Sequence, residues 1–412
     1  MSSVPTIHGD VAPGFEGVAD EFRRNFARRG EIGASVAVYR GAEPLVDLWA
    51  GTRNTATRAP WERDTTVIVY STSKGIAGLA IAAAVSAGVL DYDAPVAQYW
   101  PEFASHGKAS ITVRQLIDNQ CGLHHLRGRK IRTADLSDHD LVDSVLAEQV
   151  PAWEPGTRQG YQAISVGLYE DALFRRVDPK GRSLGAFVRE EFATPLGVDF
   201  GYGLAADRDI EEVAHPYMSK PLGVLLHERS IAWPIVIGTV TGRHPFIDAT
   251  SNPPMGPAWT IRRRSVLDQE IPSINGVTNA RALARIYGAA AADTGELPIS
   301  TRVLELITGD APPPRRDAVL GIDTRYHLGL RRSSPRLQFG SPDGRAFGTP
   351  GLGGSLAFGD PSTGIGFGYT VNRLSLALED EYRCKKLQAA VDEALTAQPG
   401  TTGQPGTRRP PA

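Results

Sequence analysis

Cysteine is scarce in this sequence, where Cys121 and Cys384 are the only two among 412 residues. Two thiols are too few for a disulfide framework or a structural zinc site, so we expect both to be reduced and buried. A charge excess is also absent, because 44 Lys and Arg face 46 Asp and Glu and the formal net charge is -2. A chain with so little net charge has no strong electrostatic field to attract nucleic acid or anionic lipid. The expected partner is therefore a small molecule or a peptide.

Long hydrophobic runs are missing as well. No stretch of about 18 apolar residues could span a bilayer, and the start, MSSVPTIHGDVAPGFEG, lacks the basic and apolar regions of a secretory signal. We therefore expect a cytoplasmic protein that does not bind a membrane. With 41% hydrophobic residues, the chain can bury a large core in one domain with insertions or in two coupled domains. The sequence gives no indication of the oligomeric state.

Segments rich in β-forming residues lie near the two ends of the chain. They are residues 34–40 and 44–51, expected to form an antiparallel hairpin, and residues 325–332, 355–361 and 364–373. Residues 360–364 form the turn between the last two segments. Gly364, Gly366 and Gly368 alternate within this block, which indicates a strand packed closely against a neighbour. Amphipathic helices are expected beside these strands at 17–29 and 379–397.

The middle of the chain has helical periodicity instead. Helices are expected at residues 75–90, 144–150, 165–177, 184–192 and 279–292. We therefore predict an α/β fold in which the terminal strands form one antiparallel sheet flanked by helices, with a mainly helical second region beside it. The predicted limits are 1–75 and 320–397 for the sheet domain and 76–319 for the helical region. Residues 398–412 are rich in Pro and Gly and are expected to be a disordered tail.

Ser71 and Lys74 stand three residues apart where a β-like run turns into a strong helix. Residues at this spacing share a helix face, so the lysine nitrogen can reach the serine oxygen. A serine hydroxyl becomes a good nucleophile when a base removes its proton, and a lysine can be that base where its neutral form is favoured by burial. The N-terminal end of the helix disfavours the ammonium and offers N–H groups to an oxyanion. The alternative is an N-capping serine beside a solvated lysine.

The same pattern occurs a second time as Ser105-His106-Gly107-Lys108. This copy is expected in a loop, because its glycine makes a helical turn less stable. It serves as an internal control, since spacing alone does not separate the two copies.

The blocks around Ser71 resemble a known family. They are STSKGIAGLAI (71–81), AGVLDYDAPVAQYWPEF (87–103), ITVRQLIDNQCGLHHL (111–126), WEPGTRQGYQAISVGLYEDALFRR (153–176) and GTPGLGGSLAFGDPSTGIGFGYTVNRL (348–374). In this order they are similar to class C β-lactamases and to β-lactamase-like carboxylesterases, the family VIII esterase branch of the serine β-lactamase and penicillin-binding protein superfamily. The resemblance covers nearly the whole chain and implies a β-lactamase/transpeptidase-like fold. It also implies an acyl-enzyme on Ser71, with Lys74 as the base and no cofactor.

The resemblance extends to the second catalytic element, at Tyr161-Gln162-Ala163. The family places a tyrosine here, and a phenol beside a lysine can relay protons between Ser71 and the leaving group. The alternative is a core or turn tyrosine. Gln162 is a candidate for substrate binding. Ala163 replaces the amide with which β-lactamases hold the lactam side chain, which points away from a dedicated β-lactamase.

The third element is a strand motif, matched here by Thr349-Pro350-Gly351. The resemblance implies that Leu352, the next residue, offers its backbone N–H to the oxyanion together with that of Ser71. Thr349 and Gly351 are candidates for substrate binding. Pro350 lacks a donor, and Thr349 brings no cation for a substrate carboxylate. Penicillin-type substrates are therefore less expected, and an altered or lost activity stays open.

A metal site is not expected. His124 and His125, with 138–140 downstream, fit no standard zinc spacing, and residues 137–138 are better explained as the cap of the following helix. The two histidines could still line a cleft. Since no Gly-x-Ser-x-Gly elbow occurs, an α/β-hydrolase is not indicated either.

The expected reaction is acyl transfer through Ser71 with a small-molecule ester or amide. Attack of water on the acyl-enzyme would give a carboxylesterase, whereas attack of an alcohol or amine would give a transesterase or an amide-forming transacylase. A catalytically silent binding protein on the same scaffold is the alternative of another class. The sequence does not decide among these.

Overall fold

The computed structural model describes residues 4–218, 235, 237–238, 241–242, 244–377, 379 and 381–397. The tail predicted at 398–412 lies outside the described residues. Within the described part of the chain, no helix is long and apolar enough to cross a lipid bilayer. Both cysteines are described, and both are buried free thiols, as expected.

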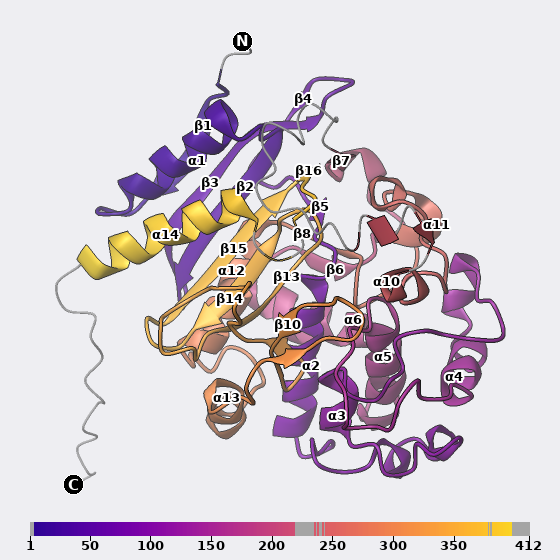
Figure 1. Cartoon of the computed structure of the whole chain (residues 1–412). Coiled ribbons are helices and arrows are strands. Elements are labelled where there is room, and N and C mark those ends of the chain that lie inside the picture. Colours follow the sequence, from indigo (N-terminus) through magenta and orange to yellow (C-terminus); the bar gives the residue numbers. More distant parts are fainter. Residues whose placement is uncertain are drawn as a thin grey trace, which may run out of the picture.

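A nine-stranded antiparallel sheet joins the two ends of the chain (Figure 1). Its order is β1-β3-β2-β15-β14-β13-β12-β11, and β4 pairs with β3. The strands are β1 (Ile7–Val11), β2 (Gly33–Arg40), β3 (Glu43–Asn54), β4 (Ala59–Pro60), β11 (Tyr326–His327), β12 (Leu330–Arg331), β13 (Phe347–Pro350), β14 (Leu356–Asp360) and β15 (Ile365–Val371). The predicted pairing of N- and C-terminal strands occurs between β2 and β15, where Val38 lies opposite Phe367.

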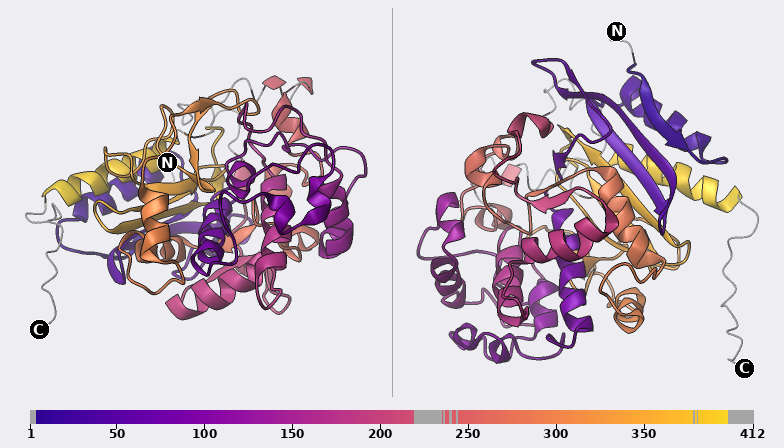
Figure 2. Two further views of the ribbon diagram at one scale, coloured as in Figure 1. Left: turned by 90° about the horizontal axis from the view of Figure 1, so that it is seen from below. Right: turned by 180° about the vertical axis from the view of Figure 1, so that it is seen from behind.

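Helices cover both faces of this sheet. Helices α1 (Glu16–Arg28) and α14 (Tyr382–Ala397) contact each other and share one apolar cluster with the sheet. Helix α12 (Ala280–Ala291) packs on β2, β14 and β15. Figure 2 shows from two further sides that α1 and α14 lie together on the sheet, away from the helices of the middle of the chain.

The glycines of β15 explain how close α12 comes to the sheet. Ile365, Phe367 and Tyr369 point into the cluster with α1 and α14, so the residues between them face α12. A Cβ on Gly366 would lie 2.1 Å from the carbonyl oxygen of Ala284, and one on Gly368 would lie 2.3 Å from that of Ala280. The close packing predicted from the alternating glycines is confirmed for Gly366 and Gly368, whereas Gly364 lies in the turn before β15 at a φ of 68° and has no such close contact with a described residue.

Helix α2 (Ser73–Ser86) connects the sheet with the helical region. Its residues from Ser73 to Ala84 are all buried, which fits its apolar composition on every side. It contacts β12, β13, α13 (Thr301–Thr308), α5 (Ser165–Val177) and α6 (Leu184–Val188). Further helices are α3 (Val113–Ile117), α4 (His139–Ala147), α7 (Thr194–Leu196), α10 (Pro245–Asp248) and α11 (Arg264–Leu267). A small three-stranded sheet has the order β5 (Val67–Ile68), β8 (Gly276–Thr278) and β6 (Phe200–Tyr202), and its strand β5 directly precedes α2 in the chain.

Two segments differ from the prediction. Residues 325–332 form two paired two-residue strands, because Leu328 and Gly329 adopt φ values of 55° and 80° and turn the chain between them. The helix expected at 184–192 continues beyond α6 as a π-helix at Arg189–Ala193. The limits of the sheet domain and the helical region stay a prediction, and α12, which lies inside 76–319, packs on the sheet.

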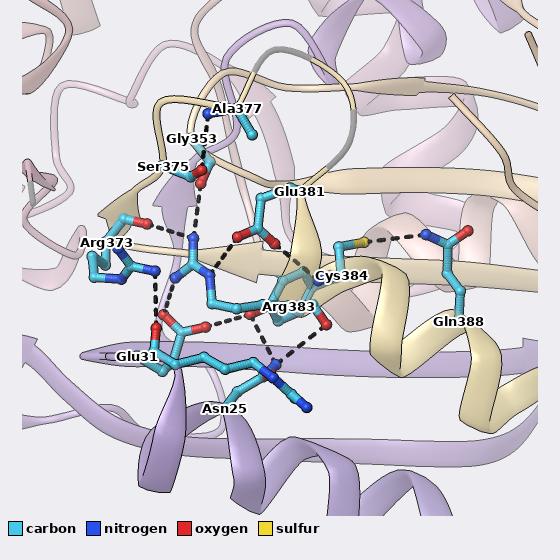
Figure 3. A network of polar contacts seen from close by, with 12 residues as sticks. Asn25, Glu31, Gly353, Arg373, Ser375, Ala377, Glu381, Arg383, Cys384 and Gln388 are labelled. Carbon is cyan, nitrogen blue, oxygen red and sulfur yellow. Dashed lines mark hydrogen bonds and ion pairs between the residues drawn. The ribbon is translucent and has the colours of Figure 1, made fainter. Parts of the chain in front are cut away.

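A buried arginine ties α14 to the loop after β13 (Figure 3). The Arg383 guanidinium, 1% exposed, donates to the Glu31 carboxylate at 2.6 Å and the Glu381 carboxylate at 2.7 Å. Its remaining donor atom, Nη2, reaches the backbone oxygens of Gly353 at 3.1 Å and Arg373 at 2.9 Å. One side chain thus fixes the C-terminal helix, the segment after α1 and the loop that contains Leu352.

We expect Arg383→Met to lower the free energy of unfolding by about 3–5 kcal/mol, because two carboxylates would stay buried without their cation. Urea unfolding measures this loss. Arg23→Met is the matched control, since Arg23 and Asp20 pair at 2.6 Å with side chains 52% and 60% exposed. Arg23→Met should lower the free energy of unfolding by less than about 1 kcal/mol. Equal effects of the two substitutions would contradict this explanation.

Candidate active site

Ser71 lies at a sharp turn between β5 and α2. The residue before it, Tyr70, adopts a left-handed φ of 49°, which is uncommon for a residue with a bulky side chain. Its buried hydroxyl donates to the backbone oxygen of Ala258 at 2.9 Å and holds the turn in place. Backbone strain of this kind gathers at functional sites. The turn places Ser71 just before the first turn of α2, as the sequence predicts.

Lys74 reaches Ser71 from the next turn of the chain. Its Nζ lies 3.2 Å from Ser71 Oγ and 2.8 Å from each of two backbone oxygens, those of Ala163 and Ser273. The side chain is buried, with 6% of the residue exposed. The two carbonyls accept two of the N–H groups of Nζ, and its third bonding position is directed at the serine hydroxyl.

Tyr161 completes the group of three side chains. Its hydroxyl lies 2.5 Å from Ser71 Oγ, and Lys74 Nζ lies 4.8 Å from the centre of its ring. The backbone N–H of Tyr161 donates to the Asp317 carboxylate at 3.1 Å. The structure therefore brings together the three side chains that the sequence singles out, from segments 90 residues apart.

Two cavities meet at Ser71. The first, of about 60 Å³, extends past Lys74 toward the sheet, and the second, of about 490 Å³, extends past Tyr70. Four of the described residues line both, namely Ser71, Tyr161, Phe246 and Leu352. A substrate with its carbonyl at Ser71 can therefore place one group in each cavity.

The third motif borders the first cavity. Thr349 and Gly351 both line it, and a Cβ on Gly351 would lie 2.3 Å from the backbone oxygen of Val69, so only glycine fits there. The N–H of Gly351 already donates to the backbone oxygen of Ser355 at 2.7 Å. Leu352 carries the next amide and lines both cavities. Its role at an oxyanion stays a prediction.

Gln162 lies apart from this group. Its side chain is fully buried, its Oε1 accepts from the Cys121 thiol at 3.4 Å, and it is not among the described residues that line either cavity. The strand-like alternation of Tyr161-Gln162-Ala163 turns it away from Ser71. Asn119 lines the first cavity instead, and its Oδ1 accepts from the N–H of Gln162 at 2.9 Å. No sequence signal indicates a role for Asn119, because its position depends on a contact with a distant segment.

The two histidines also lie away from Ser71. His124 stacks on Trp153 at 5.2 Å between ring centres, and burial lowers the pKa of its ring to about 4. Asp138 caps α4 by accepting from the N–H of Leu141, as predicted. Across the described ranges, neither His124 nor His125 borders the two cavities, and no group of three or more His, Cys, Asp or Glu side chains is placed to hold a metal ion.

The second Ser–Lys copy has a similar distance but another environment. Lys108 Nζ lies 3.3 Å from Ser105 Oγ and also donates to backbone oxygens of Ser105, Ala147 and Gln149. The Ser105 hydroxyl itself donates to the backbone oxygen of Ala147 at 2.6 Å. The segment is a series of turns, as predicted. This lysine ties two loops together, and neither residue lines the cavities described here.

Three described side chains of the first cavity that carry a guanidinium or carboxyl group were not predicted. Arg331 and Glu379 form a buried ion pair at 2.5 Å, so a cation lies near Thr349 after all, although it is already paired. Glu170 on α5 is 1% exposed, and its Oε2 has no hydrogen-bond partner within the described residues. Burial raises the pKa of Glu170 from 4.5 to about 8, although the nearby Lys74 charge counteracts part of the rise.

The raised pKa predicts how Glu170 affects stability. Between pH 4.5 and about pH 8 the folded protein keeps a proton that the unfolded chain loses, so the free energy of unfolding contributed by this group falls as the pH rises. Glu170→Gln cannot titrate. We expect the wild type to lose more stability than Glu170→Gln across this window, as measured by urea unfolding at a series of pH values. Parallel stability profiles would show that Glu170 is ionised in the folded protein.

Comparison with known proteins agrees with this architecture. The sequence matches the Beta-lactamase family over residues 18–390. It is 34% identical over 392 residues to the Esterase/beta-lactamase LipL of Mycobacterium tuberculosis, covering 89% of this chain and 83% of LipL. The structure is similar to that of a family VIII carboxylesterase, with a TM-score of 0.83 and 33% identity over 94% of this chain and 100% of the other. EstA from Arthrobacter nitroguajacolicus Rue61a has a TM-score of 0.79 and 29% identity over 94% and 98% of the two chains.

These similarities confirm the predicted β-lactamase/transpeptidase-like α/β fold. The family match covers far more than half of the chain and includes Ser71, Lys74 and Tyr161. The chain therefore belongs to the beta-lactamase family, as a hydrolase of that family.

Proposed function

We propose that this protein is a carboxylesterase that forms an acyl-enzyme on Ser71. The observation that carries the proposal is the position of Ser71 Oγ, which lies 3.2 Å from Lys74 Nζ and 2.5 Å from the Tyr161 hydroxyl at the junction of two cavities. A nucleophile that contacts two proton-accepting groups and opens into a substrate-sized space fits covalent catalysis. A silent binding protein would have no need for this arrangement.

The proposed reaction begins with transfer of the Ser71 proton toward Lys74 and Tyr161. Ser71 Oγ then bonds to the carbonyl carbon, and the backbone N–H groups of Ser71 and Leu352 stabilise the resulting oxyanion. The bond to the alcohol oxygen breaks, and that oxygen receives the proton through Tyr161. Water adds to the acyl-enzyme, leaves its hydroxyl on the acid and returns a proton to Ser71. Thr349 and Gly351 would contact the substrate in the first cavity.

The described part of the site lacks an amide for a lactam side chain and a free cation for a lactam carboxylate, so esters are favoured over β-lactams. Ala163 has no amide to hold a lactam side chain, and Thr349 has no cation for a lactam carboxylate. Arg331 could supply such a cation only by leaving Glu379, with which it pairs in a buried position. The similar family VIII carboxylesterase is named as an ester-cleaving enzyme, whereas LipL is named for both esterase and beta-lactamase activity.

The test is a panel of short-chain aryl esters, penicillins and cephalosporins, each with and without alcohol and amine acceptors. We expect the esters to turn over faster than the lactams, with the free acid as the main product. Formation of a new ester or amide when an acceptor is added would identify a transesterase or transacylase. Efficient lactam opening with poor ester turnover would contradict the proposal.

A further inference from the structure

We propose that the second cavity is an acyl-binding subsite, and that the preferred substrates are esters with a long or bulky apolar acyl group and a small alcohol. This inference rests on the proposed esterase function and specifies its substrate class. It assigns each of the two cavities at Ser71 to one side of the ester bond.

The second cavity is apolar throughout its described wall. Ile164, Met255, Ile261 and Ile274 supply aliphatic surface, and Trp259 borders the cavity as well. The described residues that line this cavity include no charged side chain. A charged or strongly polar group would lose its hydration there without a partner, whereas an apolar group would gain by leaving water.

Two hydroxyl groups of the described wall, those of Tyr70 and Thr250, are already engaged in hydrogen bonds. The hydroxyl of Tyr70 donates to the backbone oxygen of Ala258 at 2.9 Å. The hydroxyl of Thr250 donates to the backbone oxygen of Phe246 at 2.9 Å and that of Ile247 at 3.1 Å. Among the described lining residues, only Ser71 and Tyr161, at the junction with the first cavity, bring reactive oxygen atoms to the space. The cavity therefore selects by shape and hydrophobicity.

The two cavities differ in size and polarity. The second holds about 490 Å³, whereas the first holds about 60 Å³ and is bordered by Lys74, Glu170 and the Arg331–Glu379 pair. The bulkier and more apolar part of a substrate thus fits only the second cavity. The smaller and more polar part fits the first.

The position of Lys74 assigns the two sides of the ester. The departing alcohol oxygen receives its proton through Tyr161, which lines both cavities, and Tyr161 is resupplied from Lys74. Lys74 lines the first cavity and is not among the described residues of the second. We therefore assign the alcohol to the first cavity, beside the group that supplies its proton, and the acyl group that stays bonded to Ser71 Oγ to the second.

Two series of esters test this orientation. The first lengthens the acyl group from acetyl to decanoyl in ethyl esters, and the second lengthens the alcohol from ethyl to decyl in acetate esters. We expect kcat/KM to rise by at least about tenfold along the acyl series and to stay flat along the alcohol series. A rise along the alcohol series alone would overturn the orientation, and flat profiles in both would overturn the subsite. Absence of turnover with every ester would instead refute the proposed esterase function.

Variants of the cavity wall connect the selectivity to this site. Ile274→Phe should lower the ratio of decanoyl to acetyl turnover by about tenfold, because it fills the space. Trp259→Ala should also lower this ratio by removing apolar wall, and it should fold because Trp259 is 52% exposed. Leu306→Phe is the control, since Leu306 lies on α13 at 46% exposure and does not line the described cavity. An unchanged ratio in both wall variants would overturn the proposal.

Discussion

The buried amine of Lys74 is the contact on which the site depends. Its Nζ joins α2 to the backbone oxygens of Ala163 and Ser273, which belong to segments distant in the sequence. Tyr161 lies two residues before the first of these oxygens, so the same contact that places the amine also places the phenol. A buried amine needs such acceptors, because a polar nitrogen without partners inside the protein would cost free energy. Positioning for the reaction and stability of the fold therefore share one set of hydrogen bonds.

The sequence predicts the parts of this site that depend on local spacing. Ser71 and Lys74 are one helical turn apart, and the change from a β-like run to an apolar helix shows where that turn begins. Gly366 and Gly368 similarly predict a close contact, because glycines that alternate along a strand leave room for a neighbouring backbone. Tyr161 could be placed only through the resemblance to a family, since nothing near it in the chain refers to Ser71.

Other parts of the site could not be predicted because they depend on contacts between distant segments. The oxygens of Ala163 and Ser273 are backbone atoms, and any residue type could supply them. Glu170 lies in an ordinary amphipathic helix, and only the packing of α5 on α2 brings it to the first cavity. The sequence predicts one β-rich segment at residues 325–332, but it does not predict the turn that divides this segment into β11 and β12. Gln162 was predicted to bind substrate because of its place in the second motif. Its side chain is buried, and it is not among the described residues that line either cavity.

The two Ser–Lys pairs show what distance alone does not provide. Nζ and Oγ are 3.2 Å apart at Lys74 and Ser71, and 3.3 Å apart at Lys108 and Ser105. Ser105 donates its proton to a backbone oxygen, whereas Ser71 contacts a phenol and borders both cavities. The two pairs thus differ in the phenol and the open space beside Ser71, and we assign the reaction to Ser71 on that difference.

The rate of labelling by a fluorophosphonate, followed by intact-protein mass, tests this account most directly. The wild type and Ser105→Ala should each gain one adduct at the same rate, and Ser71→Ala should gain none. Lys74→Arg should be labelled about 100-fold to 10,000-fold more slowly, because a guanidinium keeps its proton and cannot act as the base. Labelling of Ser71→Ala at the wild-type rate, or of a folded Lys74→Arg at that rate, would contradict the account.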